Sequence, residues 1–156
     1  MTRLAAAGLI LYSYFEIRRA LPLLASSAPS HNVNFAVSTL LWTSFGVEVL
    51  LYTSLVLVPL IGRAYPGYVH FGARRLSDYT PSQLDRVMPV LKSMVGILCC
   101  AVTLSLSLEI HLRIRYALVD FRKQPPTLAV YTTMLVSFLL ITWFYVQKMD
   151  QAAGRD

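Results

Sequence analysis

A single acidic side chain interrupts a long apolar run near the middle of the chain. The run covers residues 35–61, and Glu48 lies thirteen residues from each end of it. A carboxylate that deep in a bilayer costs about 2.5–3.5 kcal/mol on insertion scales, so its neighbours must offset this cost. One interpretation makes Glu48 a proton or cation site, or a contact for a partner helix. The other makes it a protonated side chain bonded to a hydroxyl of a neighbouring helix, such as Thr103, Ser105 or Ser107.

The densest group of polar side chains lies where another apolar run ends. Glu109 and Arg113 are four residues apart, and so are His111 and Arg115, so a helix would place each pair on one face. An imidazole beside a carboxylate at a membrane edge can shuttle protons, which leaves open a membrane enzyme that uses Glu109 and His111. The alternative is a helix end that is solvated by lipid headgroups.

Other residue patterns that carry chemistry are missing from the sequence. It has no GxSxG element, no HExxH pair and no glycine-rich phosphate loop, so we expect that the protein is not an enzyme. Cys99 and Cys100 are adjacent, which fits neither a CxxC redox pair nor a spaced metal site. The three histidines lie in separate segments without ligand spacing, and we therefore expect no metal and no other cofactor.

The composition places these residues in a membrane protein. Of the 156 residues, 56% are hydrophobic and 14% are charged, whereas soluble domains average about 45–50% and about 25%. Such hydrophobicity also excludes a disordered chain. The net charge of +6 would suggest nucleic acid for a soluble protein, but most basic residues flank apolar runs, where they fix topology and meet anionic headgroups. We expect a lipid bilayer around the chain and no nucleic-acid partner.

Apolar segments predict the elements that must position these side chains. The expected spans are residues 4–24, 35–61, 90–108 and 128–146. The first is the weakest, because Glu16, Arg18 and Arg19 interrupt it, and it either crosses with the others or lies flat on the membrane. The sequence thus predicts an all-α fold: one integral membrane domain over residues 1–156, built as a polytopic transmembrane bundle of four helices.

Local signals predict where two of these helices begin and end. The segment 80–83 (TPSQ) reads as a capping box with proline at the first helical position. The helical pattern continues to about Val119, some 58 Å in length, and we expect Pro89 to kink this long third helix. Pro59 and Gly62 are expected to mark the end of the second span, since glycine suits a C-terminal cap.

The positions of the basic residues predict an orientation. If all four segments cross, both termini and the connection 63–86 share one side, which carries eight Lys and Arg against six on the other. The positive-inside rule then places both termini in the cytoplasm.

Three stretches resemble one family of membrane proteins. Residues 28–32 (APSHN) are similar to the P-x-H element after the first helix of bacterial membrane proteins of unknown function related to SdpI-type immunity proteins. The stretch 66–89 is similar to the basic second connection of these proteins, and the final helix with its basic tail also fits. The resemblance implies a small four-helix protein of the inner membrane, tied to immunity or signalling against a membrane-active toxin. It makes Pro29 and His31 candidate loop residues.

Three functions remain open at this level. The first is a non-enzymatic protein of the bacterial cytoplasmic membrane that acts through helix–helix contacts with a membrane partner or with further copies of itself. In the second, Glu48 titrates in a component of proton- or ion-coupled transport. The third is the membrane enzyme that would use Glu109 and His111. The missing catalytic motifs favour the first function.

Overall fold

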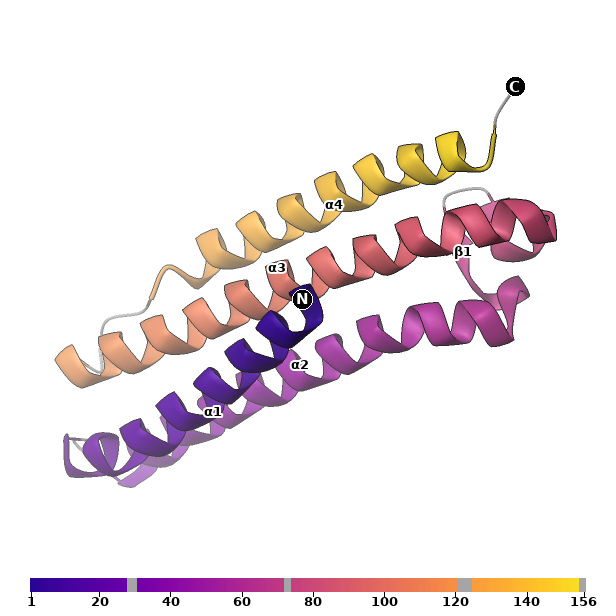
Figure 1. The fold of residues 1–156 in the computed structure, drawn as a ribbon. Coiled ribbons are helices and arrows are strands. Elements are labelled where there is room, and N and C mark those ends of the chain that lie inside the picture. The colour runs from indigo at the N-terminus through magenta and orange to yellow at the C-terminus, as the bar shows by residue number, and fades with distance from the viewer. Residues whose placement is uncertain (28–30, 72–73, 121–124, 155–156) are drawn as a thin grey trace.

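The protein is a bundle of long helices arranged around one central helix. A computed structural model describes residues 1–27, 31–71, 74–120 and 125–154, and within these ranges it contains four α-helices. They are α1 (Thr2–Ser27), α2 (His31–Ala64), α3 (Pro81–Val119) and α4 (Thr127–Ala152). Helix α3 lies between α4 on one side and the pair α1 and α2 on the other (Figure 1). The predicted all-α bundle is confirmed.

Of the described helices, α2, α3 and α4 are long and apolar enough to cross a membrane. Large apolar side chains cover their outer faces, as Leu50 on α2 and Leu139 and Leu140 on α4 illustrate. A soluble monomer rarely exposes apolar surface on this scale. The length and composition of these helices are those of an integral membrane protein.

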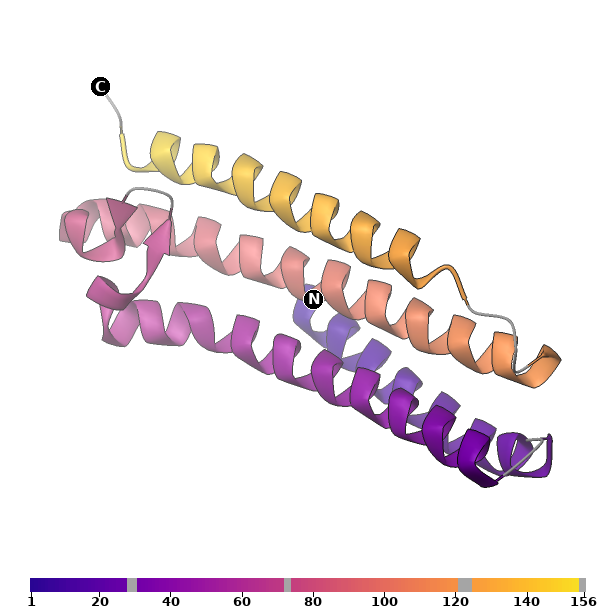
Figure 2. The ribbon, with the colours of Figure 1, turned by 180° about the vertical axis from the view of Figure 1, so that it is seen from behind.

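Helix α1 is not among these candidate spans, and whether it crosses the membrane stays a prediction. It packs lengthwise against α2 and α3 (Figure 2). Its buried residues follow one face at helical spacing: Ala6, Ser13, Ile17, Ala20 and Leu24. Small side chains on that face let the helix backbones approach closely. Arg18 and Arg19 are exposed and Glu16 is half-buried, so the fully buried positions of α1 carry no charge.

The first turn of α1 lies part way along α3. The Cys100 thiol donates a hydrogen bond to the Thr2 carbonyl oxygen at 2.8 Å, and Cys100 is about 28 Å along α3 from its start at 1.5 Å per residue. The N-terminus therefore lies part way along the bundle, and the side of the membrane that it shares with the connection 63–86 stays a prediction. The packing of the small-residue face of α1 against α3 sets the position of α1 along that helix.

The start of α3 follows the predicted signal, whereas the end of α2 does not. At the start of α3, the Gln83 amide donates to Thr80 Oγ1 at 3.4 Å and the Thr80 amide donates to Gln83 Oε1 at 3.0 Å, which is the predicted capping box. Helix α3 continues without interruption through Pro89. The predicted end of the second span is wrong, because α2 runs on to Ala64.

Gly62 lies inside α2 rather than at a C-terminal cap. It is buried inside α2, and a Cβ at this position would lie 3.4 Å from Leu76 Cδ2 and 3.8 Å from Leu91 Cδ2. These are ordinary van der Waals distances, so the packing at this position has room for a Cβ and does not require glycine.

The connection between α2 and α3 forms a small structured unit at one end of the bundle, here called the hairpin end. It contains η1 (Pro66–Tyr68), β1 (His70–Phe71), β2 (Arg74–Arg75) and η2 (Leu76–Asp78). The strands are antiparallel, with His70 opposite Arg75. Strands of two residues have no alternation for a sequence to show, so this hairpin was not predicted. At the opposite end, here called the far end, α1 and α3 finish and α2 and α4 begin (Figure 1).

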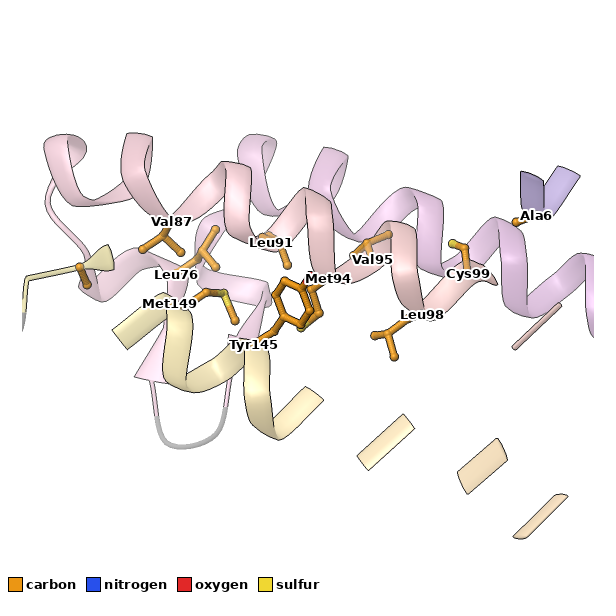
Figure 3. Close-up of a cluster of buried hydrophobic side chains, with 11 residues drawn as sticks. Ala6, Leu76, Val87, Leu91, Met94, Val95, Leu98, Cys99, Tyr145 and Met149 are labelled. Carbon is orange, nitrogen blue, oxygen red and sulfur yellow. The ribbon is translucent and has the colours of Figure 1, made fainter. Parts of the chain in front are cut away.

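Two clusters of buried apolar side chains form the core. The hairpin-end cluster joins Leu76, the first half of α3 and the end of α4, where Tyr145 and Met149 face Met94 and Leu91 (Figure 3). The far-end cluster joins α1, α2 and α3 around Ile17, Leu41, Ile110 and Ile114. On α1 and α3, the residues between the two clusters include polar side chains.

Candidate functional site

A buried chain of three polar side chains, here called the polar layer, separates the two apolar clusters. Ser13 of α1 donates a hydrogen bond to Ser107 Oγ of α3 at 2.8 Å, and Ser107 donates to Glu48 Oε1 of α2 at 2.8 Å. Ser107 Oγ also lies 3.3 Å from the Leu9 carbonyl oxygen. Ser13 and Glu48 are fully buried and Ser107 nearly so. Each of the three helices thus contributes one side chain.

The polar layer shows which hydroxyl forms a hydrogen bond with Glu48. Of the three candidates from the sequence, Ser107 is in contact with it. Thr103 and Ser105 instead donate to carbonyl oxygens one turn back in α3, those of Cys99 at 2.7 Å and Ala101 at 2.9 Å. Hydroxyls that bond within their own helix are already satisfied and add little between helices.

Ser13 was not predicted as a member of this layer. It is the polar exception in the first apolar run, and that was the available signal. The sequence could not use it, because the partner of Ser13 depends on how α1 is placed against α3. The second carboxylate oxygen of Glu48, Oε2, has no hydrogen-bond partner among the described residues.

The predicted cluster at the end of α3 divides between two faces of the helix. Glu109 is fully buried and pairs with Arg113, and Tyr131 of α4 lies beside this pair. His111 faces α1, where its Nδ1 lies 3.4 Å from Glu16 Oε2 and 3.2 Å from the Tyr12 hydroxyl. Among the described residues, His111 therefore does not pair with Arg115. His111 meets Glu16 rather than Glu109, so the geometry does not bring together the two residues that the enzyme hypothesis needs.

An apolar groove runs between α2 and α4, and side chains of α3 form its floor. It consists of two cavities that share Leu55, Val58 and Phe138, with volumes of about 430 and about 290 Å³. Their walls are apolar apart from a few groups, among them Ser54 of α2 and Thr142 of α4. The Thr142 hydroxyl is buried and has no hydrogen-bond partner in the described part of the chain. We call this feature the α2/α4 groove.

The remaining candidates add no site. His31 is the exposed first residue of α2, and Pro29 lies outside the described residues. Across the described ranges, no three His, Cys, Asp or Glu side chains come together in a way that could hold a metal ion.

Comparisons with protein-family models, curated proteins and solved structures give no match to this chain. The resemblance to the SdpI-related family therefore stays a prediction, and any functional argument depends on the geometry.

Proposed function

We propose that this protein acts without catalysis, by binding a membrane-spanning helix of a partner protein in the bacterial cytoplasmic membrane. The α2/α4 groove is the observation that carries this proposal. It opens sideways to the surroundings of the bundle, where a neighbouring helix would lie alongside α2 and α4.

The position of α4 makes the groove. Helix α4 packs mainly against α3, with α1 and α2 on the other side of that helix. Half of the apolar window of α3 is buried, whereas none of the corresponding window of α4 is. A spanning helix with so little buried surface leaves most of its side chains available to lipid or to another helix.

Two hydroxyls in the groove favour a helix over lipid tails. Helix association in a bilayer depends on close packing and on hydrogen bonds between helices, since lipid tails are as apolar as leucine. Ser54 and Thr142 line opposite walls, and the Thr142 Oγ1 atom lacks a partner among the described residues. Ser54 is exposed on α2, so a partner helix could hydrogen-bond its hydroxyl, whereas an acyl chain could not.

Photo-cross-linking in native membranes tests the proposal. A photoreactive residue at Thr142 should give an adduct whose attached peptide, identified by mass spectrometry, belongs to a membrane-spanning segment. The same residue at Thr133, an exposed position of α4 outside the groove lining, is the control and should give at least tenfold less adduct. Equal adducts at both positions, or lipid adducts alone at Thr142, would contradict the proposal.

A second candidate, proton- or ion-coupled transport, is favoured by the unpartnered Glu48 Oε2. It predicts that Glu48→Gln abolishes a proton or cation flux into liposomes while the cross-link at Thr142 persists. Equal flux in wild type and Glu48→Gln would exclude it, and Glu48 would then be a packing group of the bundle.

A further inference from the structure

A second, charged groove lies between the C-terminal halves of α1 and α3, on a part of the surface that the α2/α4 groove does not reach. Its volume is about 310 Å³. Its polar lining comes from Glu16 and Arg19 of α1 and from His111 and Arg115 of α3. Its apolar lining comes from Ala20, Leu23, Ile114 and Leu118. We call it the arginine groove.

The charge of the arginine groove is positive. Glu16 is the one acidic side chain in its lining, and that carboxylate is engaged by His111 at 3.4 Å. Among the described residues, neither Arg19 nor Arg115 takes part in an ion pair. Two guanidinium groups therefore remain free to bind an anion, and guanidinium geometry matches that of a phosphate in particular.

The depth of the arginine groove in the bilayer indicates which kind of anion it binds. The arginine groove is lined by residues 16–23 of α1 and 111–118 of α3, the two helices that finish at the far end of the bundle (Figure 2). Aromatic and basic side chains at helix ends mark the headgroup region of a membrane. The two arginines are thus placed at the level of lipid phosphates.

The surface that continues from the arginine groove toward the bundle centre is apolar. On α3, Leu104 and Leu108 precede His111 and Arg115 on the same helical face, and they are 58% and 49% exposed. On α1, Phe15 lies one turn before Arg19 and is 64% exposed. An acyl chain attached to a phosphate between the arginines would lie over these side chains, whereas a free phosphate would leave them uncovered.

We infer that the arginine groove binds one anionic phospholipid, with the headgroup phosphate between Arg19 and Arg115 and an acyl chain over Leu104 and Leu108. Basic pockets between spanning helices hold anionic headgroups by the same combination of charge and apolar contact. This site is independent of the partner-binding groove between α2 and α4.

Native mass spectrometry of the detergent-purified full chain tests the inference. Phosphatidylglycerol and phosphatidylcholine with identical acyl chains are compared, and the wild type should retain one phosphatidylglycerol in strong preference. Arg19→Gln/Arg115→Gln should weaken phosphatidylglycerol binding about 30-fold, since each basic residue near a headgroup contributes roughly fivefold. Phosphatidylcholine binding should change less than threefold.

A matched variant separates a specific site from net charge. Arg18→Gln/Arg63→Gln removes the same two charges, but neither residue lines the arginine groove, so binding should stay within threefold of wild type. Leu23→Trp keeps every charge and fills the cavity, and it should also reduce phosphatidylglycerol binding. It keeps the test valid if the double arginine variant does not fold.

Three outcomes would overturn the inference. The first is equal retention of the two lipids by the wild type. The second is an equal loss in the matched charge variant. The third is displacement of phosphatidylglycerol by millimolar inorganic phosphate or glycerol phosphate, which would make the occupant a soluble anion rather than a lipid.

Discussion

Glu48 is held by a hydroxyl on a second helix that itself accepts a hydrogen bond from a third. Ser107 can donate its single proton once, and the geometry directs it to Glu48 Oε1 while Ser13 donates to Ser107. Every bond in this chain runs between helices, so the polar layer links α1, α2 and α3 at one level of the bundle. We therefore expect that disrupting the polar layer weakens the packing between these helices and leaves each helix itself intact.

Ser107→Ala tests the polar layer. It removes both interhelical bonds of that hydroxyl and leaves a buried carboxyl without its partner, so we expect a loss of about 1–2 kcal/mol in unfolding free energy. Ser105→Ala removes a bond within α3 alone and should cost less than about 0.5 kcal/mol. The unfolding free energies of the two variants are compared in mixed micelles. Equal losses would mean that the hydrogen bonds between helices add no stability beyond a bond within one helix.

Glu48→Gln separates packing from titration. The glutamine oxygen can still accept the Ser107 proton, and the side-chain volume is nearly unchanged, so unfolding free energy should stay within about 1 kcal/mol of wild type. Under the proposed function, the cross-link from Thr142 also persists. A large loss of stability would show that the amide cannot replace the carboxyl in this environment.

A larger loss of unfolding free energy is expected for the buried pair of Glu109 and Arg113. Glu109 is fully buried, so Arg113→Gln leaves its carboxylate uncompensated and should cost about 3 kcal/mol. The double variant Glu109→Gln/Arg113→Gln removes both charges and should recover more than half of that loss. A double-mutant cycle on unfolding free energies measures the coupling, and additive losses would contradict a direct pair.

At the scale of the elements, the first turn of α1 depends on the absence of a side chain at Gly96. A Cβ there would collide with Thr2 Oγ1, and the Thr2 carbonyl oxygen accepts its hydrogen bond from Cys100 one turn further on. Glycine thus allows the close approach that positions α1 along α3.

Gly96→Leu should push this turn of α1 away and expose Cys100. We expect the rate of maleimide labelling of the detergent-purified protein to rise at least fivefold at Cys100, while buried Cys99 stays slow. Gly46→Leu is the control, because nothing lies within 4 Å of a Cβ at that position. An unchanged rate in Gly96→Leu would show that α1 does not depend on this contact.

The sequence could predict the elements but not their mutual placement. Apolar length and the capping box at Thr80 are local signals, so the long helices and the start of α3 were predicted correctly. Pro59 and Gly62 look like terminators locally, but α2 continues past both of them to Ala64. Ser107 was named as a partner of Glu48 among three equivalent hydroxyls, and helix packing selected it. Predicting the Ser13 hydrogen bond and the Glu16–His111 contact would have required the position of α1 against α3, and no local sequence pattern encodes that position.

At the scale of the whole molecule, the two grooves lie in different chemical surroundings. The α2/α4 groove is apolar and extends along the membrane-crossing helices, which suits another helix. The arginine groove carries its charge at the far end, which suits a headgroup. A partner helix and a bound lipid could therefore occupy the protein at the same time without competing.

The arrangement of helices also fixes which connections share a side of the membrane. His31 begins α2 and Thr127 begins α4, so both lie at the far end, whereas Ser77 lies in the connection at the hairpin end. If α2 and α3 each cross the membrane, two crossings separate His31 from Thr127. The connection that holds Ser77 is rich in arginine, and the positive-inside rule predicts that it faces the cytoplasm.

Accessibility of single cysteines in intact cells tests this topology. In a Cys99→Ala/Cys100→Ala background, a membrane-impermeant maleimide should label His31→Cys and Thr127→Cys from outside, and Ser77→Cys should react after permeabilisation only. Labelling of Ser77→Cys alone in intact cells would reverse the orientation but keep the two crossings. Labelling of all three from one side would contradict them, because α2 and α3 could not then both span the bilayer that their length and apolar surface require.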